Sequence, residues 1–378
     1  MNLQPFEGSA VPLTAFVGFG LALATSLAAA GGKPPPATPP ASPDIVYMSD
    51  EGKMAVWQAG VRGTTLSADQ KSAADSSLLN STAGRVYTSV TWSPDGKRFA
   101  WIEISNSMRG SSASILAASP GGKPAVIYTS ADGDGKPALS HNPDALAWGL
   151  DCDGTNSVLA FLSTSPIGIY GIPFEGGKPG STPVPLVNLQ DPQYVLIPHA
   201  FAFSPTGKNL VFVAGTTALA DGIELLPMCP TPASPTTLVP MSNLAAGNVH
   251  ITSIDWSRDG ARLALSMYIY PNEWRDMKVV ELHYSSDNST EQVIGFKSIV
   301  PINLDTVFGA ASSEHSPSWG PLTSSSGGCQ RFAFSRSTDL GRSLYLLDYP
   351  VTDDATCDIS MSAPRLISSK YPRAIDWR

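Results

Sequence analysis

Apolar and polar residues alternate along most of the chain in short runs, and turns rich in Pro and Gly separate these runs. The clearest case is 86–101, VYTSVTWSPDGKRFAW, in which one run ends at Trp92, a Ser-Pro-Asp-Gly turn follows at 93–96, and a second run begins at Arg98. A period of two places successive side chains on opposite faces of a strand, and Pro and Gly favour a tight reversal. The stretch therefore predicts a β-hairpin.

Weaker copies of this hairpin recur along the chain. We call the aromatic residue that ends the first strand of each copy the anchor residue. The six anchor residues are Trp92, Trp148, Phe203, Trp256, Trp319 and Trp377. Successive anchor residues are 56, 55, 53, 63 and 58 positions apart. After each of the first five, a turn leads to a second apolar run, and two further short runs follow. Four short strands per repeat are typical of the blades of a β-propeller, with the anchor residues packed between blades.

The two ends of the repeat region complete each other. Strands are predicted from Ile45 and Met54 with no anchor strand before them, and the last eight residues, YPRAIDWR, form an anchor strand with nothing after it. Together they would make one blade and leave no sheet edge exposed. We therefore predict an all-β domain over 44–378: a six-bladed β-propeller of four-stranded antiparallel blades, closed by pairing of the C-terminal strand with the N-terminal strands.

The phrases TWSPDGKRFAW, FSPTGKNLVF and WSRDGARLAL resemble the repeat of TolB-type (WD40-like) six-bladed propellers, and the resemblance covers 44–378. It departs from the family pattern where Gly149 and Gly320 follow an anchor residue. In that family the propeller is mostly a binding platform in the periplasm or the gatekeeping domain of a larger enzyme. The resemblance implies a binding role, because the Gly-x-Ser-x-Gly motif of a hydrolase domain does not occur in this sequence.

Residues 1–31 differ in kind from the rest of the chain. The run from Val11 to Ala30 carries no charge and ends in three small residues of the type that precede a signal cleavage site. The first basic residue is only Lys33, so an uncleaved anchor would also fit, as would a buried core helix. We predict a signal peptide or N-terminal membrane anchor at 1–31 and a Pro-rich linker at 32–43. The protein is then periplasmic or extracellular, with a possible membrane tether.

Charge narrows the class of partner. The chain has 24 Lys and Arg against 32 Asp and Glu, which gives a net charge of -8 at pH 7, and its basic residues form no stripe. Binding to phosphate backbones requires clustered Lys and Arg, so we do not expect a nucleic acid partner. We expect a monomer that binds a protein or a small-molecule ligand and holds no cofactor.

The innermost strands of a propeller surround a central channel, and the residue four positions before each anchor residue should lie near its mouth. These residues are all polar, in strands that otherwise read apolar. They are Thr88, Asp144, His199, Thr252, His315 and Arg373. Polar groups that converge on a concavity are typical of ligand sites, so we predict that they bind the ligand. Channel residues bridged by water would give the same pattern.

Three of these residues raise the possibility of a metal. Imidazole and carboxylate ligands suit zinc, which makes Asp144, His199 and His315 weak candidates. Because the two histidines lie two blades apart, no metal site is predicted. We expect an exported, non-enzymatic binding or scaffold propeller that uses the channel mouth or rim loops. The alternative is a metal-dependent small-molecule hydrolase or lyase at the same mouth.

The four cysteines suggest disulfide bonds in an oxidising compartment. Cys329 opens a second strand and Cys357 lies in the loop after the third strand of the same blade, so we predict a bond between them. Cys152 and Cys229 occupy turns on the same face of adjacent blades. Whether they pair stays open, because a bond requires Cα atoms within about 7 Å.

Overall fold

The computed structural model describes part of the chain. The described residues are 45–49, 54–57, 75–79, 85–107, 110–119, 122–131, 133–189, 200–217, 220–229, 234–244, 248–270, 274–285, 292–302, 304, 313–320, 328–338, 341–350, 365–368 and 372–377. All of them belong to the second of two compact units, 41–378. The predicted signal peptide or anchor and the linker lie outside the described residues and stay predictions. None of the helices in the described part could cross a membrane, since none is both long and apolar enough.

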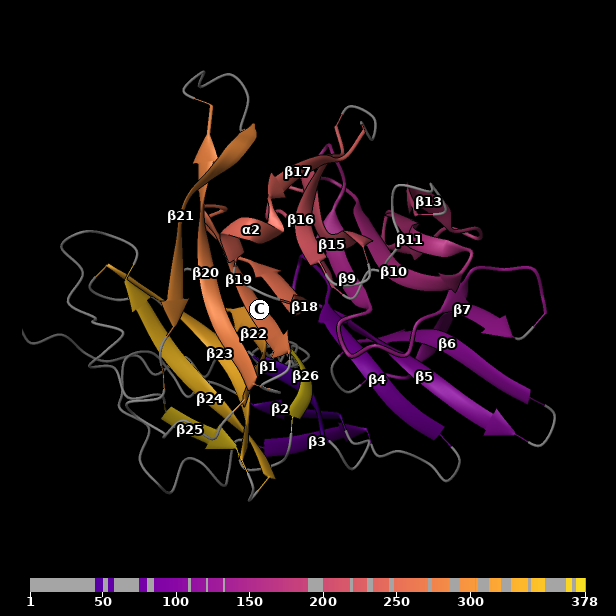
Figure 1. Ribbon diagram of the computed structural model, residues 1–378. Coiled ribbons are helices and arrows are strands. Elements are labelled where there is room, and N and C mark those ends of the chain that lie inside the picture. The colour runs from indigo at the N-terminus through magenta and orange to yellow at the C-terminus, as the bar shows by residue number, and fades with distance from the viewer. Residues whose placement is uncertain are drawn as a thin grey trace, which may run out of the picture. The chain divides into compact units, whose positions relative to one another are not determined.

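Hydrogen bonds group the described strands into five sheets (Figure 1). One four-stranded sheet contains β4 (Arg85–Trp92), β5 (Phe99–Ser107), β6 (Gly110–Ala118) and β7 (Ala125–Ala131). A six-stranded sheet contains β8 (Ala138–Leu139), β9 (Leu146–Leu150), β10 (Ser157–Ser165), β11 (Ile167–Glu175), β12 (Lys178–Pro179) and β13 (Val184–Asn188). A second four-stranded sheet contains β22 (Ser313–Trp319), β23 (Cys329–Thr338), β24 (Gly341–Pro350) and β25 (Arg365–Ser368).

The largest sheet has eight strands in two antiparallel groups. The first group is β14 (Phe201–Phe203), β15 (Asn209–Thr217), β16 (Ala220–Pro227) and β17 (Thr236–Val239). The second is β18 (Asn248–Trp256), β19 (Arg262–Tyr270), β20 (Trp274–Tyr284) and β21 (Val293–Ile302). A short helix, α2 (Met241–Leu244), lies between them in the sequence. The groups are joined by one parallel pairing of β16 with β18, at Ala220 and Val249.

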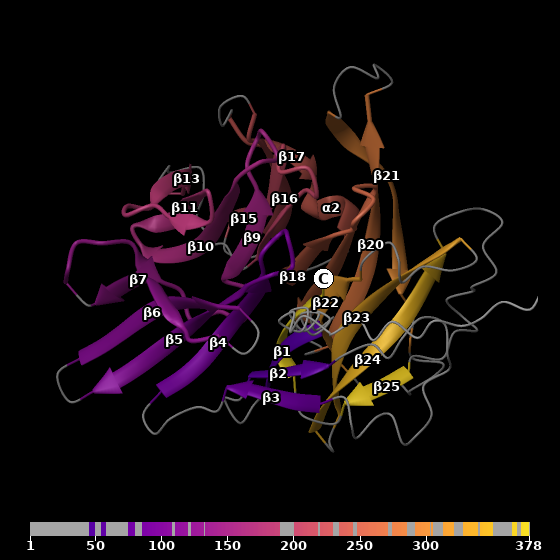
Figure 2. The ribbon, with the colours of Figure 1, turned by 180° about the vertical axis from the view of Figure 1, so that it is seen from behind.

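The fifth sheet joins the two ends of the repeat region. Its order is β26 (Pro372–Trp377), β1 (Ile45–Ser49), β2 (Met54–Trp57) and β3 (Asp75–Leu79). β26 pairs antiparallel with β1, so that Ile45 lies opposite Trp377 and Met48 opposite Ala374. Figure 2 shows β1, β2 and β3 of this sheet one after another. The predicted pairing of the C-terminal strand with the N-terminal strands is confirmed.

The anchor strands contact one another in a closed circuit, in the order β4, β9, β14, β18, β22, β26 and back to β4. The described residues therefore form an all-β propeller in which five blades and the pairing of the two end strands complete the ring. The sequence predicts six separate four-stranded sheets, but the hydrogen bonds of the described strands define five sheets of unequal size. The bridge between β16 and β18 merges two groups into one sheet, and the sheet of β9 has six strands.

The predicted turn at 93–96 forms as its residue types require. Gly96 adopts φ 66°, which glycine tolerates best, and Gly96 N donates to Ser93 O. The Ser93 hydroxyl donates to Asp95 Oδ1 (2.6 Å), and Lys97 N also donates to Asp95 Oδ1 (3.1 Å). Partial burial alone would raise the pKa of Asp95, but these two bonds and nearby Lys97 and Arg98 outweigh it and lower the pKa. The turn carboxylate is structural, as predicted.

The anchor residues pack between blades, as predicted. All five tryptophans are at most 1% exposed. Two anchor rings also explain the glycines that depart from the repeat. A Cβ on Gly149 would lie 2.2 Å from Cγ of Phe203, and one on Gly320 would lie 2.9 Å from the ring of Trp377. Glycine follows these two anchors because the next anchor ring lies directly against it.

Candidate functional site at the centre of the propeller

In each anchor strand, the backbone N–H of the anchor residue makes no hydrogen bond to the neighbouring strand of its own sheet. Ser93 N donates to Arg98 O, and the same bond forms from Ser204 N to Asn209 O and from Ser257 to Arg262. In an antiparallel ladder bonded pairs alternate with non-bonded pairs, so the residue before each of these serines, the anchor residue, points its N–H away from the neighbouring strand. A buried N–H without an acceptor is costly, so these groups require partners from elsewhere.

The residue immediately before each anchor can supply that partner. We call these the pre-anchor residues: Thr91, Ala147, Ala202, Asp255, Ser318 and Asp376. Each polar pre-anchor side chain accepts a hydrogen bond from the anchor N–H of the next blade in the circuit, which we call a junction bond. The four junction bonds are Trp92 N to Asp376 Oδ2 (2.6 Å), Trp148 N to Thr91 Oγ1 (3.2 Å), Trp319 N to Asp255 Oδ2 (2.7 Å) and Trp377 N to Ser318 Oγ (3.0 Å).

Two junctions lack this bond because their pre-anchor residue is alanine. Ala147 precedes the junction to Phe203, and Ala202 precedes the junction to Trp256. Among the described residues, no side chain and no carbonyl group of a turn or loop accepts from the N–H of Phe203 or Trp256. We call this part of the ring, from β9 through β14 to β18, the alanine side.

Each junction of the alanine side has another connection instead. The blade of β9 is bonded to the group of β14 by the disulfide Cys152–Cys229, whose Cα atoms are 5.4 Å apart. The groups of β14 and β18 share the β16–β18 bridge. Sequence reasoning left the Cys152 and Cys229 pairing open, and the structure shows that they pair.

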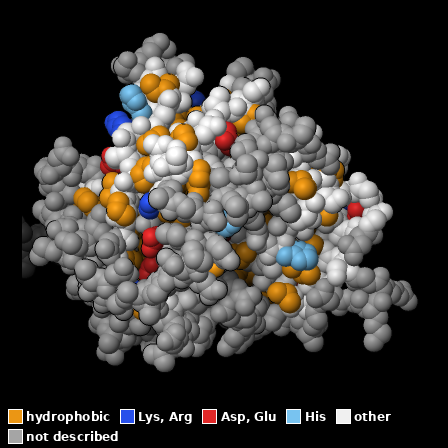
Figure 3. Space-filling view, in the orientation of Figure 1, with side chains coloured by type: hydrophobic (Ala, Val, Ile, Leu, Met, Phe, Trp, Pro, Cys, Tyr) orange, Lys and Arg blue, Asp and Glu red, His pale blue; other side chains and the backbone are white. Residues whose placement is uncertain are grey.

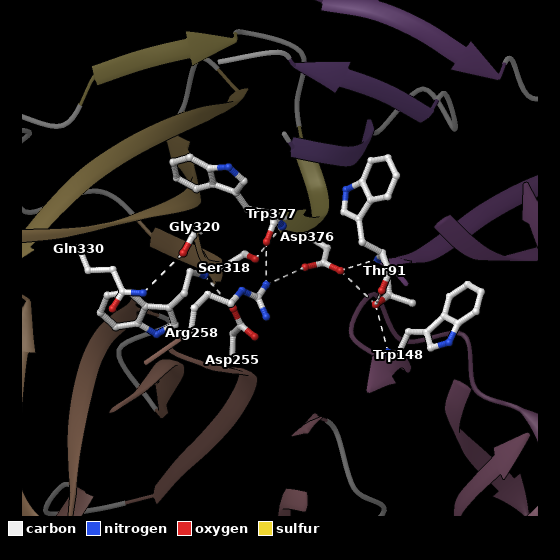
Figure 4. Close-up of polar contacts among 11 residues, drawn as sticks. Thr91, Trp148, Asp255, Arg258, Ser318, Gly320, Gln330, Asp376 and Trp377 are labelled. Atoms are coloured by element: carbon white, nitrogen blue, oxygen red, sulfur yellow. Dashed lines mark hydrogen bonds and ion pairs between the residues drawn. The ribbon is translucent and has the colours of Figure 1, made fainter. Parts of the chain in front are cut away.

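On the other side of the ring, one ion pair reaches across the centre. Arg258, in the turn after β18, extends toward Asp376 of β26, two blades further round the circuit (Figure 4). Arg258 Nη2 lies 3.6 Å from Asp376 Oδ1 and donates to Trp377 O (2.7 Å). Asp376 Oδ2 also accepts from the Thr91 hydroxyl (3.0 Å). Asp376 therefore connects three parts of the ring in a setting where its side chain is only 12% exposed.

A cavity lies among these groups. All six pre-anchor residues line it, together with Asp144, Arg258 and Phe203, and it is partly open to solvent. The charged side chains on its wall are three carboxylates, Asp144, Asp255 and Asp376, and one guanidinium, Arg258. The arrangement can bind a small polar molecule through many hydrogen bonds, and it is the candidate site of this protein.

The structure distributes the predicted mouth residues over different settings. Of those whose side chains the structure describes, Asp144 lines the cavity. Thr88 is half-buried, and its hydroxyl has no hydrogen-bond partner in the described part of the chain. Thr252 is also half-buried, and its hydroxyl lies 3.3 Å from both O and Oγ of Ser266. Thr252 thus bonds to its own blade rather than to the cavity.

His315 is buried, with 6% of its surface exposed, and its Nε2 lies 3.0 Å from Ser337 Oγ. His199 lies outside the described residues. Arg373 belongs to β26, but its side chain is not described. Whether these six residues act as one ligand site therefore stays a prediction.

The described residues bring no three His, Cys, Asp or Glu side chains close enough together to hold a metal ion. Of the weak candidates, Asp144 lines the cavity, His315 does not, and His199 is not described. For the predicted Cys329–Cys357 bond, Cys329 carries a disulfide and not a free thiol. Cys357 lies outside the described residues, so this pairing stays a prediction.

The sequence did not predict the pre-anchor residues, because the predicted mouth residues lie three positions before them, at the fourth residue before each anchor. A signal was present. Threonine, aspartate or serine directly precedes a tryptophan in SVTW, SIDW, SPSW and AIDW, at the same place in four anchor strands. Such a buried polar residue indicates a specific hydrogen-bond partner.

No family model matches the sequence, and no curated protein matches it. Among solved structures, TolB from Acinetobacter baumannii matches with a TM-score of 0.53 at 15% identity, over 89% of this chain and 66% of TolB. Prolyl oligopeptidase B from Galerina marginata matches with a TM-score of 0.43 at 10% identity (87% of this chain, 43% of that chain). A protein from Lactobacillus plantarum matches with a TM-score of 0.42 at 12% identity (89% and 85%).

The likeness to TolB shows the fold alone. The chain resembles TolB as a distant propeller and spans just under two thirds of TolB's length. No family is assigned by the sequence.

Proposed function

We propose that this protein is an exported, non-enzymatic binding propeller whose central cavity receives a small polar ligand. The observation that carries the proposal is the cavity, because polar or charged side chains from four anchor strands and Asp144 line one concave space. A scaffold that binds a protein at the cavity mouth or rim loops is the wider form of the same proposal. In the view of Figure 3, the visible described Lys and Arg side chains are scattered, so we keep the expectation that no nucleic acid binds.

We also infer that the closing sheet counts as a sixth blade. Two facts support this count: six anchor strands contact one another in one circuit, and the closing sheet is four-stranded with β26 at its inner edge. In this interpretation the eight-stranded sheet is two blades that share one bridge. The resemblance to the TolB-type repeat supports the same count.

Export is supported by the apolar run at 11–30 and by the Cys152–Cys229 bond, since structural disulfides persist mainly outside the reducing cytosol. Cell fractionation with N-terminal sequencing of the mature protein tests this part. Recovery of the unprocessed chain in the cytosol, with reduced cysteines, would contradict it. A fragment that begins between Ala30 and Asp44 indicates cleavage, and an intact N-terminus in the membrane fraction indicates an anchor.

The binding role is tested with Asp144→Asn. Neutral, anionic and cationic metabolites are screened against the full chain by ligand-observed NMR, and each compound that binds is titrated against the variant. We expect at least one compound to lose affinity, because Asp144 lines the cavity. The matched control is Asp153→Asn, an exposed aspartate in the β9–β10 turn. If no compound distinguishes the two variants, the cavity is not the binding site.

The metal-dependent hydrolase or lyase remains the alternative, and no observation in the described residues favours it. It would require Asp144, His199 and His315 to share one ion. Metal analysis of the purified protein, repeated on His199→Ala, tests it. A stoichiometric metal that this variant loses would favour the enzyme.

A further inference from the structure

The alanine side of the cavity offers hydrogen-bond donors. The N–H groups of Phe203 and Trp256 point away from the strands paired with their own. No described side chain and no carbonyl group of a described turn or loop accepts from them. Phe203, Ala147 and Ala202 line the cavity, so an acceptor for the Phe203 N–H would stand at its wall. Trp256 itself does not line the cavity, but Ala202 and Asp255 beside its N–H do. Four equivalent N–H groups in the same ring have side-chain acceptors at 2.6 to 3.2 Å, which shows the geometry that an acceptor must satisfy. A ligand atom in that position would replace the absent side-chain oxygen.

The charge of the wall restricts what that ligand atom can be. Three carboxylates and one guanidinium line the cavity, so an anion would meet net negative charge. A cationic amine would suit the carboxylates but could not accept from the two N–H groups. A hydroxyl group satisfies both, because it accepts from an N–H and donates to a carboxylate. Several hydroxyls on one small, neutral molecule fit the alternation of donors and acceptors around the wall.

We propose that the alanine side binds a neutral, hydroxyl-rich ligand of the monosaccharide class, with ligand oxygens accepting from Phe203 N and Trp256 N. This inference rests on the proposed binding function and specifies its ligand. The wall carboxylates, Asp144 among them, accept from the ligand's hydroxyls. The ligand then completes the two junction bonds that Ala147 and Ala202 leave open.

The first experiment measures the class of ligand. Glucose, galactose, mannose and N-acetylglucosamine are titrated into the full chain at millimolar concentrations by ligand-observed NMR, beside glutamate as the anion and spermidine as the cation. At least one monosaccharide should bind, and glutamate and spermidine should not bind at the same site. Binding of glutamate or spermidine alone, with Asp144-dependence, would overturn the ligand class while leaving the proposed function intact.

The second experiment distinguishes the effect of occupying the N–H donors from the effect of a larger side chain in the cavity. Ala147→Thr and Ala202→Thr reproduce Thr91 at the equivalent position and supply the missing acceptor from the protein itself. Ala147→Val and Ala202→Val have nearly the same shape without a hydroxyl. Each Thr variant should weaken monosaccharide binding about tenfold relative to its Val partner, because the N–H is then occupied.

Equal losses in the Thr and Val variants would mean that bulk alone excludes the ligand, and the donor assignment would be wrong. Melting temperatures show whether each variant folds, and each Thr variant should melt above its Val partner. If no compound of any class binds in an Asp144-dependent manner, the proposed function fails, and this inference fails with it.

Discussion

The two sides of the ring are held together by different means. Across four junctions an anchor N–H donates to a polar pre-anchor side chain, and Arg258 adds an ion pair through the centre. On the alanine side the pre-anchor side chains offer no acceptor, and a disulfide and a strand bridge connect the blades instead. The comparison shows that neighbouring blades with the same kind of anchor residue can be joined by a junction bond or by a different connection. Where a different connection joins them, the anchor N–H stays available as a donor.

The largest effect is expected from Asp376→Ala. This change removes the acceptor of Trp92 N and Thr91 Oγ1 and leaves Arg258 without its carboxylate in a mostly buried setting. Breaking such a pair costs about 3–5 kcal/mol of unfolding free energy, measured by urea denaturation. Asp376→Asn, which keeps one acceptor oxygen, should lose less. A loss below about 1 kcal/mol would mean that the contacts of Asp376 stabilise the fold no more than a surface ion pair does.

On the alanine side, the double variant Cys152→Ser, Cys229→Ser should lose about 2–4 kcal/mol. The bond closes a sequence separation of 77 residues and connects a junction that has no bond at the centre. Adding Ala147→Thr should restore about 1 kcal/mol by creating a junction bond to Phe203 N. If Ala147→Thr restores no more than Ala147→Val does, the junction bond has no stabilising value.

A smaller effect is expected from Ser318→Ala. The change leaves Trp377 N without its acceptor in a buried position, which costs about 1–2 kcal/mol by denaturant titration. The matched control is Ser242→Ala in α2, whose hydroxyl is exposed and donates to Asn243 Oδ1. Equal stability of the two variants would show that water satisfies the freed N–H.

The smallest effect compares two copies of the turn. The turn after Trp92 has Asp95 where the corresponding turn after Phe203, on the alanine side, has Thr206. The test variant is therefore Asp95→Thr. The folded pKa of Asp95 lies below its ordinary value, so its contribution is present above about pH 4 and is lost as pH falls through the folded pKa. Asp95→Thr should cost less than about 1 kcal/mol at pH 7, because the side chain is 49% exposed. The difference in unfolding free energy between the variant and the wild type should shrink toward pH 3. If it grew there instead, the pKa of Asp95 would be raised in the folded state and not lowered.

The sequence predicts the parts of this molecule that depend on local pattern. The hairpin around Trp92, the anchor residues and the pairing of β26 with β1 follow from period, turn chemistry and the need to protect sheet edges. The bridge between β16 and β18 could not be predicted, because it depends on how far two neighbouring blades splay apart.

The site was harder to predict than the fold, for a physical reason. A junction bond joins a side chain to a backbone N–H in a different blade, so its value appears only when the blades are placed. Thr91 and Asp255 look like ordinary polar strand residues until Trp148 and Trp319 lie beside them. Counting four positions back from each anchor did find Asp144 on the cavity wall, but it passed over the pre-anchor residues.

The pairing of Ile45 with Trp377 has a consequence for the biosynthesis of the protein. These residues are 332 positions apart (377 minus 45), and a ribosome adds about 5–20 residues per second. Strand β1 is therefore synthesised roughly 15 to 70 seconds before β26, the strand with which it pairs. During that interval its edge stays open to pairing with other strands, a risk that ends only when the last strand of the ring is made.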